Sequence, residues 1–238
     1  MKREMISVLI PCHNYGIYLK ECIESVLVQK GSNIFEKMNN SDNAEYDLEI
    51  IVVDDGSEDN TAEICGLYKE VKYIYQKQSG VSHSRNTLLK AANGDYIAFL
   101  DADDVWVSDK LQKQYNYLKK NTECMIVGCE YQNFESNVPT SSDHREEGAV
   151  HLLIPSLIKR SVFEKVGMFD ESLKKGEDTD LIIRMRKAGI DYGSRVDEVL
   201  LFRRKHELNI SNDRTAIKRD IAALLRSNLI KQKGNTEK

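Results

Sequence analysis

The feature of the sequence that most constrains the fold is an alternation of two kinds of segment over the first hundred residues. Short apolar runs that fit buried strands alternate with longer segments whose apolar residues recur at helical spacing. The expected strands are residues 5–10, 48–53, 71–75 and 96–100, and the expected helices are residues 17–28, about 59–67 and 81–92. This order predicts parallel strands joined by crossover helices on both faces of a sheet. The predicted class is therefore α/β, with a mostly parallel central sheet.

Two polar segments interrupt this pattern and divide the chain. Residues 31–47 are rich in asparagine, and we expect them to form a surface insertion before the second strand. Residues 132–148 carry no period, and we expect a mobile loop there. The predicted organisation is a first half at 1–131, a smaller subregion at 132–212 and an amphipathic C-terminal helix at 213–238.

An acidic cluster directly follows the expected strand at 96–100. Asp101, Asp103 and Asp104 place three carboxylates within four residues, and such groups repel one another unless positive charge lies between them. A hard divalent cation takes oxygen ligands and bridges to substrate phosphates, and parallel sheets bind ligands at the carboxyl ends of their strands. The cluster therefore predicts a metal site. The alternative is a solvated turn that caps a helix over 105–118.

Two weaker clusters fit the binding of a nucleotide. The carboxylate of Asp55, after the strand at 48–53, can accept a hydrogen bond from a base imide or a ribose hydroxyl. In segment 78–86, Gly80 and small residues open a helix whose start attracts anions. Arg85, about one turn further on, can add a charged fork to a phosphate. An ordinary Asp-Gly turn and a helix start with an exposed arginine remain as alternatives.

Two clusters in the second half of the chain can serve a transfer reaction. Glu177, Asp178 and Asp180 precede an apolar helical pattern, and one of them can act as general base for an acceptor hydroxyl. Capping of the helix dipole is the default explanation for such acids. His206 follows the expected strand at 198–202 and can reach a metal or a diphosphate, although a lone histidine is more often structural.

These clusters, in this order, resemble the family 2 glycosyltransferases, which have the GT-A fold, a Rossmann-like fold. The resemblance covers roughly residues 5–210 and implies that residues 1–131 bind a nucleotide sugar while residues 132–212 receive the acceptor. The segments that carry it are Val8-Leu9-Ile10-Pro11-Cys12-His13-Asn14-Tyr15, Ile51 to Ser57, Gly80 with Ser84-Arg85-Asn86, Gly94-Asp95-Tyr96 running to Asp101-Ala102-Asp103-Asp104, and Val166-Gly167-Met168-Phe169-Asp170 followed by Gly176-Glu177-Asp178.

For the donor side, the resemblance implies that Pro11, His13 and Asp55 lie around the nucleotide base. It implies that Asp101 contacts the ribose and that Arg85 faces the donor. The implied donor is a nucleoside-diphosphate sugar, with UDP favoured over GDP or TDP.

For the reacting centre, the resemblance implies that Asp103 binds Mn²⁺ or Mg²⁺ and that His206 completes the metal or diphosphate site. Asp178 is the implied catalytic base, acting with inversion at the anomeric carbon. The chain lacks the QxxRW motif and the membrane spans of processive polysaccharide synthases, which favours transfer of a single sugar. A glycan or lipid-linked acceptor in surface glycan or polysaccharide biosynthesis is implied by analogy.

Composition restricts the partners and the compartment. The net charge of −4 gives no broad basic field for nucleic acid. The five cysteines form no CxxC pair, and the first residues do not have the pattern of a signal peptide, so we expect reduced thiols in a cytoplasmic protein. The C-terminal helix at 213–238 is expected to pack on the domain. Peripheral contact with the inner face of the cell membrane is the alternative.

Three other functions compete with transfer of a sugar. A haloacid-dehalogenase-like phosphatase also has a DxD after a parallel strand, but normally after an early strand. A nucleotidyltransferase needs a glycine-rich, basic loop after its first strand, where this chain has Pro11-Cys12-His13-Asn14. A nucleotide-sugar-binding protein with weak or no catalysis is disfavoured because acids are present at both the metal and the base positions.

Overall fold

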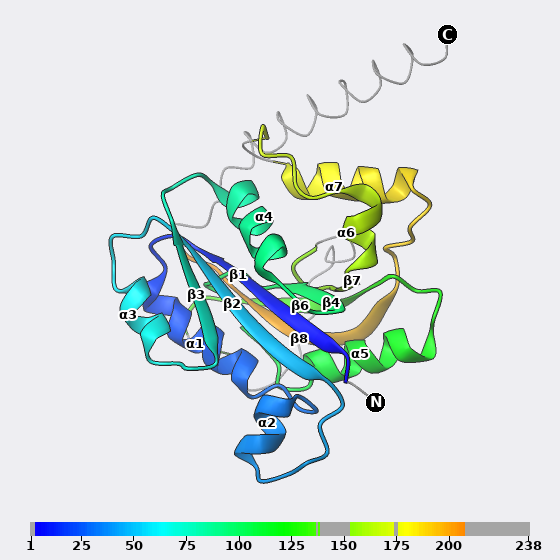
Figure 1. Cartoon of the computed structure of the whole chain (residues 1–238), viewed down its shortest axis with the longest axis horizontal. Coiled ribbons are helices and arrows are strands. Elements are labelled where there is room, and N and C mark those ends of the chain that lie inside the picture. The colour runs from blue at the N-terminus through cyan, green and yellow to red at the C-terminus, as the bar shows by residue number, and fades with distance from the viewer. Residues whose placement is uncertain (1–2, 137, 139–152, 174–175, 208–238) are drawn as a thin grey trace, which may run out of the picture.

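The computed structural model describes residues 3–136, 138, 153–173 and 176–207, and Figure 1 shows the arrangement. The elements along the chain are β1 (Met5–Cys12), α1 (Gly16–Leu27), α2 (Asn33–Met38), β2 (Asp47–Asp55), α3 (Thr61–Gly66), β3 (Val71–Gln76), α4 (Val81–Ala91), β4 (Tyr96–Phe99), β5 (Val105–Trp106), α5 (Lys110–Lys120), β6 (Ile126–Phe134), β7 (Leu157–Lys159), α6 (Ser161–Val166), α7 (Glu177–Lys187) and β8 (Arg195–Arg204).

In the described part of the chain, one sheet of eight strands, in the order β3-β2-β1-β4-β7-β6-β8-β5, forms the centre of the molecule. The four strands β1 to β4 are parallel to one another, β7 runs antiparallel to β4 and β6, and β6 is parallel to β8. In Figure 1, α4 and α7 lie on one side of the sheet, and α1 and α5 lie on the other. The predicted α/β class with a mostly parallel central sheet is confirmed.

The sheet is buried on both faces because its central strands are continuous apolar runs. Val8, Leu9 and Ile10 on β1 are fully buried, and the β-branched residues of β2 are buried beside them. Helix α4 packs on β1 and β2, whereas α5 packs on β6 and β8. Buried parallel strands require apolar side chains on both faces, which is why these runs were recognisable without a structure.

The insertion at 31–47 is more ordered than its polar composition suggests. It contains α2, whose N-cap Ser32 accepts a hydrogen bond from the backbone of Phe35 at 3.1 Å. Asn33 Oδ1 accepts from the Leu48 amide at 2.9 Å, and the Tyr46 side chain is fully buried. The segment is therefore attached to the start of β2 by side-chain contacts and by one core aromatic residue.

Two boundaries differ from the prediction. The proposed helix over 105–118 is wrong at its start, because Val105 and Trp106 form β5 and pair with Phe202 and Leu201 of β8. Strand β6 continues to Phe134, so the first residues of the loop predicted at 132–148 are in the sheet. Most of that loop and the whole of the predicted helix at 213–238 lie outside the described residues.

Lys110 is a charged residue in the core that the sequence pattern did not indicate. Its side chain is fully buried, and Nζ donates to Gln114 Oε1 at 2.7 Å and lies 4.1 Å from the centre of the Trp106 ring. Burial disfavours the ammonium form and lowers the pKa of Lys110 to about 8 from its ordinary 10.5. This lysine is expected to make stability depend on alkaline pH.

The Lys110 contribution to the free energy of unfolding should rise between pH 8 and pH 10.5, because the unfolded chain then binds more protons at this residue than the folded chain does. The contribution is about 3 kcal/mol, from roughly 1.4 kcal/mol per pKa unit. Below pH 8 Lys110 is protonated in both the folded and the unfolded chain, and its contribution to the free energy of unfolding is constant. In urea denaturation from pH 7 to 10.5, the wild type and Lys120→Met, an exposed control on the same helix, should gain stability relative to Lys110→Met as the pH rises. The difference is the measure, because buried cysteine thiols with raised pKa values lower the stability of every variant above pH 9. An identical profile in Lys110→Met would contradict this origin.

Candidate functional site

The carboxyl ends of β1, β2 and β4 bring the predicted site residues to one edge of the sheet. The strands are parallel and in register, with Cys12 opposite Asp54 and Leu9 opposite Phe99. The segments that leave these ends carry His13, Asp55 and the acidic turn that follows β4. This is the edge at which open α/β sheets bind ligands.

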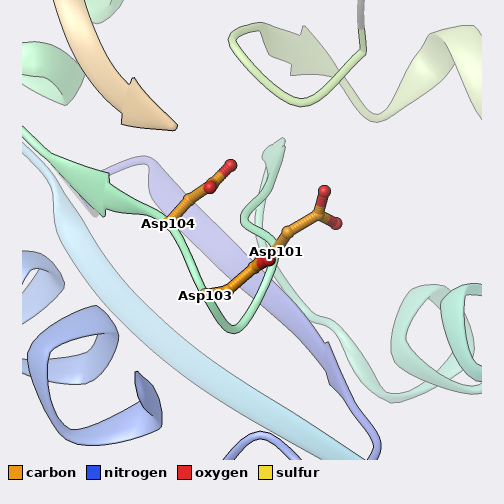
Figure 2. Close-up of side chains that lie close together, drawn as sticks. All are labelled: Asp101, Asp103 and Asp104. Atoms are coloured by element: carbon orange, nitrogen blue, oxygen red, sulfur yellow. The ribbon is translucent and has the colours of Figure 1, made fainter. Parts of the chain in front are cut away.

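The acidic turn after β4 gathers three carboxylates. Carboxylate oxygens of Asp101, Asp103 and Asp104 lie within 4.8 Å of one another, and Figure 2 shows the three side chains leaving one short loop. The loop is closed by a hydrogen bond from the Asp104 amide to the Asp101 carbonyl at 3.0 Å. This close spacing confirms that the three acids form one cluster.

Burial and the crowding of negative charge raise the pKa values of two carboxyl groups in the cluster. Burial raises the pKa of Asp101 to about 6, with Asp103 and Asp178 adding to the rise and Arg85 opposing it. Burial, together with the neighbouring carboxylates of Asp103 and Asp101, raises the pKa of Asp104 well above its usual range. Carboxylates in such a setting favour an added cation, and their oxygen atoms are the ligands that Mn²⁺ and Mg²⁺ prefer.

His206 is brought to this cluster although it lies about a hundred residues later in the chain. Its Nε2 is 2.9 Å from Asp103 Oδ2, and about a tenth of each side chain is exposed. The imidazole ring packs against Tyr18, with centroids 4.9 Å apart, and against the edge of Tyr15 at 5.5 Å. The two residues proposed for the metal site therefore meet.

Arg85 connects the acidic turn to α7. Its Nη1 donates to Glu177 Oε1 at 2.9 Å and to Asp178 Oδ1 at 2.8 Å, and its Nη2 lies 3.7 Å from Asp101 Oδ1. The guanidinium is buried and lies 5.4 Å from the centre of the Phe169 ring. The alternative of an exposed arginine at a helix start is wrong. The sequence predicts a phosphate as the partner of Arg85, which stays a prediction; in the structure its guanidinium contacts three carboxylates.

The first turn of α7 presents its acids to two different partners. Gly176 precedes the helix in the left-handed conformation, with φ of 84°, which orients the turn. Glu177 and Asp178 face Arg85, whereas Asp180 pairs with Arg184 at 2.7 Å within the helix. Burial and the nearby Asp178 raise the pKa of Glu177, and Arg85 opposes the rise. Asp180 is thereby engaged away from the site.

Asp55 holds the start of α4. Its Oδ1 accepts from the Ser79 amide at 2.8 Å and from Gln76 Nε2 at 2.7 Å, and its Oδ2 accepts from the Gly80 amide at 2.8 Å. Gly56 next to it has φ of 77°, and a Cβ there would lie 2.8 Å from the Gln78 amide nitrogen, so only glycine fits. The structure thus places Asp55 at the predicted edge and gives it partners from its own chain.

The other residues predicted to surround the base lie beside Asp55. The Nε2 atom of His13 is 3.0 Å from the side-chain nitrogen of Gln78. Pro11, the second-last residue of β1, is half-buried and lies opposite Val53 of β2. The geometry therefore brings Pro11, His13 and Asp55 together, and their role towards a nucleotide base stays a prediction.

Sequence reasoning did not predict the contacts of three residues that shape the site. Asn86 of α4 is buried and holds the Phe169 backbone with both amide atoms, at 3.0 Å and 2.9 Å, so it ties α4 to the segment before α7. Glu177 shares Arg85 with Asp178. Arg204 contacts the acidic turn from β8. A motif indicates residue types but not which neighbour they face, and nothing local in the sequence distinguishes Arg204 from the adjacent Arg203.

A cavity of about 410 Å³ lies at the opposite edge of the sheet, among residues near the amino ends of β1 and β4. Two of the cations that line it have partners, since Lys119 pairs with Glu4 at 2.9 Å and Lys159 Nζ donates to the Thr122 carbonyl at 2.6 Å. It is separate from the acidic cluster. Within the described part of the chain, every helix is too short or too polar to cross a bilayer.

Comparison with known proteins gives a family match over most of the chain. The sequence model described as "Glycosyl transferase family 2" matches residues 7–180. An uncharacterized glycosyltransferase of Rickettsia typhi is 30% identical over 230 aligned residues, which cover 87% of this chain and 66% of that protein. This chain thus spans just under two thirds of that relative, and 42% of glycosyltransferase GlyG of Streptococcus pneumoniae, which is 32% identical over 139 residues.

Solved structures support the same fold at lower identity. A fragment of S. aureus TarS in complex with UDP-GlcNAc is similar with a TM-score of 0.67 and 20% identity, over 90% of this chain and 61% of that one. The mannosyltransferase PcManGT of Pyrobaculum calidifontis, in complex with GDP-Man and Mn²⁺, has a TM-score of 0.64 and 16% identity, over 89% of this chain and 60% of that one.

Proposed function

Because the chain belongs to glycosyl transferase family 2, we propose that it is a metal-dependent enzyme that moves one sugar from a nucleoside-diphosphate sugar to an acceptor hydroxyl. The observation that carries this proposal is Arg85, whose one guanidinium contacts Asp101 of the acidic turn and Asp178 of α7. A candidate donor site and a candidate base therefore belong to a single site.

The residues of the acidic turn fit a divalent cation. Asp103 offers a carboxylate oxygen, and His206 offers an imidazole nitrogen next to it. When bound, Mn²⁺ or Mg²⁺ would neutralise the charge that develops on the departing diphosphate. PcManGT, which shares the fold, was solved with Mn²⁺. The choice between the two ions is open to measurement.

The donor proposed is a nucleoside-diphosphate sugar, with UDP favoured. The two structural neighbours hold UDP-GlcNAc and GDP-Man, respectively. Pro11, His13 and Asp55 would surround the base, with the remaining lone pair of the Asp55 carboxylate available to an imide N–H. Asp101 would contact the ribose, and Arg85 behind it would hold that carboxylate in place.

Asp178 is proposed as the general base. It would take the proton from the acceptor hydroxyl while that oxygen forms a bond to the anomeric carbon. The bond from that carbon to the diphosphate oxygen breaks on the opposite face, and the nucleoside diphosphate leaves with the electron pair. The configuration at the carbon is therefore inverted. The bond from Arg85 Nη1 at 2.8 Å fixes the side chain of Asp178 for this task.

The acceptor proposed is a glycan or a lipid-linked oligosaccharide in surface polysaccharide biosynthesis, by analogy with the family. A lipid-linked acceptor would place the enzyme in the cytoplasm at the inner face of the cell membrane. The net charge of −4 does not favour nucleic acid as a partner.

The proposal is tested by a screen of UDP-, GDP- and TDP-sugars with MnCl₂. One donor is expected to raise the free energy of unfolding by about 2.7 kcal/mol at a hundredfold excess over its Kd. The same donor should be cleaved to nucleoside diphosphate faster when acceptor glycans are added, and EDTA should abolish both effects. Absence of stabilisation by every donor would contradict the proposal.

The same screen separates the alternatives. A nucleotide-sugar-binding protein without catalysis would be stabilised by a donor but would release no nucleoside diphosphate with any acceptor. A haloacid-dehalogenase-like phosphatase would release inorganic phosphate from sugar phosphates without an acceptor. Family membership and the position of the acidic turn after β4 favour the transferase over both.

A further inference from the structure

Arg204, the last residue of β8, contacts the acidic turn at two points. Its side-chain Nε donates to the carbonyl of Asp103 at 3.0 Å, and its backbone amide donates to Asp104 Oδ1 at 3.0 Å. Figure 2 shows the Asp104 carboxylate directed towards the end of β8. One residue therefore holds two consecutive residues of the cluster.

The guanidinium of Arg204 is itself fixed on all sides. It forms an ion pair with Glu21 of α1 through Nη2, and it lies 4.7 Å from the ring centre of Tyr18 and 4.4 Å from that of Phe134. The side chain is only 5% exposed. A planar, delocalised cation suits stacking between two rings with simultaneous hydrogen bonds at its edge, and an ammonium group does not.

The position of Arg204 also determines where His206 enters the site. His206 follows two residues later and packs on Tyr18, the ring that also contacts Arg204. Its Nε2 then lies 2.9 Å from the Asp103 carboxylate. The contacts of Arg204 thus act on both members of the Asp103–His206 pair. They fix the backbone of Asp103, and they fix the end of β8 that leads to His206.

Asp104 differs from its two neighbours because Arg204 engages it. Asp104 as a residue is 2% exposed and its carboxylate accepts the Arg204 amide, whereas the Asp101 side chain is 40% exposed. Asp104 is therefore used to join the turn to β8, and Asp101 and Asp103 are left to face a ligand.

Building on the proposed function, we propose that Arg204 is a positioning residue for the divalent cation: it holds the Asp103 backbone and the Asp104 carboxylate so that the Asp103 carboxylate and His206 face one point. It acts through Asp103 and does not itself touch the cation. Loss of its planar contacts should weaken cation affinity more than it slows turnover once the cation is saturating.

The test uses Arg204→Lys, which keeps the positive charge and removes the planar fork. Binding of Mn²⁺ to the full chain, followed by the electron paramagnetic resonance signal of the free ion in the presence of UDP, is expected to weaken by about 10- to 100-fold. Turnover at saturating Mn²⁺ and donor should stay within about threefold of the wild type. Arg195→Lys is the matched control, because Arg195 lies on the same strand, is bonded to Asp197 and is exposed.

Wild-type Mn²⁺ affinity in folded Arg204→Lys would overturn this proposal, as would a loss of turnover at saturating Mn²⁺ with unchanged affinity. If that variant does not fold, Glu21→Gln carries the test, since it removes only the charge that orients Arg204. It should weaken Mn²⁺ binding in the same direction by a smaller factor, and unchanged affinity would overturn the proposal. Failure of the wild type to bind Mn²⁺ with any nucleotide would instead defeat the proposed function.

Discussion

Replacing Asp178 with asparagine is expected to lower kcat by about 10²- to 10⁴-fold while changing the KM for the donor little. An amide cannot accept the proton of the acceptor hydroxyl, but its oxygen can still accept the 2.8 Å hydrogen bond from Arg85. The site should therefore keep its shape and lose only its base. Steady-state release of nucleoside diphosphate at saturating donor and acceptor measures the effect.

Glu177→Gln is the matched control for this variant. Glu177 is the neighbouring residue in the same helical turn, bonds to the same Arg85 nitrogen and loses the same charge on substitution. Its kcat is expected to fall by less than about tenfold, since general-base catalysis accounts for the larger losses. A large loss in Glu177→Gln together with near-normal turnover in Asp178→Asn would assign the base to Glu177 instead.

The edge of the sheet that carries the site could be predicted because it depends on local pattern alone. The apolar runs that form β1, β2 and β4 are short, continuous and followed by polar turns. Parallel strands bring their carboxyl ends together whatever their side chains are. The convergence of Asp55 and the acidic turn after β4 on one edge follows from that geometry, and the structure confirms it.

The second half of the sheet could not be predicted in the same way. Strand β5 has two residues and exists because it pairs with β8, nearly a hundred residues later. Strand β7 has three residues between two antiparallel neighbours, β4 and β6. Pairings of this kind depend on tertiary contacts that leave no period in the sequence. Lys110 was missed for a related reason, because nothing local distinguishes a buried lysine from an exposed one.

The partners of charged residues were the least predictable part of the site. Arg85 was expected at a helix start, and its type and position were correctly identified. Two of the three carboxylates that it faces belong to α7, which follows about ninety residues later, and the third is Asp101 of the acidic turn. Likewise, the donors to Asp55 come from the loop before α4, which its own turn motif does not contain. Motifs identified the residues, and only the fold assigned their neighbours.

Asp103 illustrates how a residue can be present for function at a cost to stability. Its carboxylate lies within 4.8 Å of those of Asp101 and Asp104 and adds to the rise that burial causes in the pKa of both, so the three charges repel one another. Asp103→Ala removes this repulsion along with one bond to His206. The melting temperature of the metal-free protein is therefore not expected to fall, as is common for substitutions at strained functional sites.

Asp103→Ala should weaken the binding of the donor nucleotide, although it is not expected to lower the melting temperature. The Kd of UDP measured by calorimetry with MnCl₂ is expected to rise by about 100-fold or more, since a bound cation contributes several kcal/mol and each 1.4 kcal/mol is tenfold. Without MnCl₂, the variant and the wild type should bind UDP equally weakly.

Asp197→Ala, an exposed acid on β8, is the matched control and should bind like the wild type. If GDP proves to be the preferred nucleotide in the donor screen, it replaces UDP in all arms. Unchanged affinity in Asp103→Ala with MnCl₂ present would remove Asp103 from the metal site, and a fall in melting temperature would mean that its bond to His206 outweighs the repulsion.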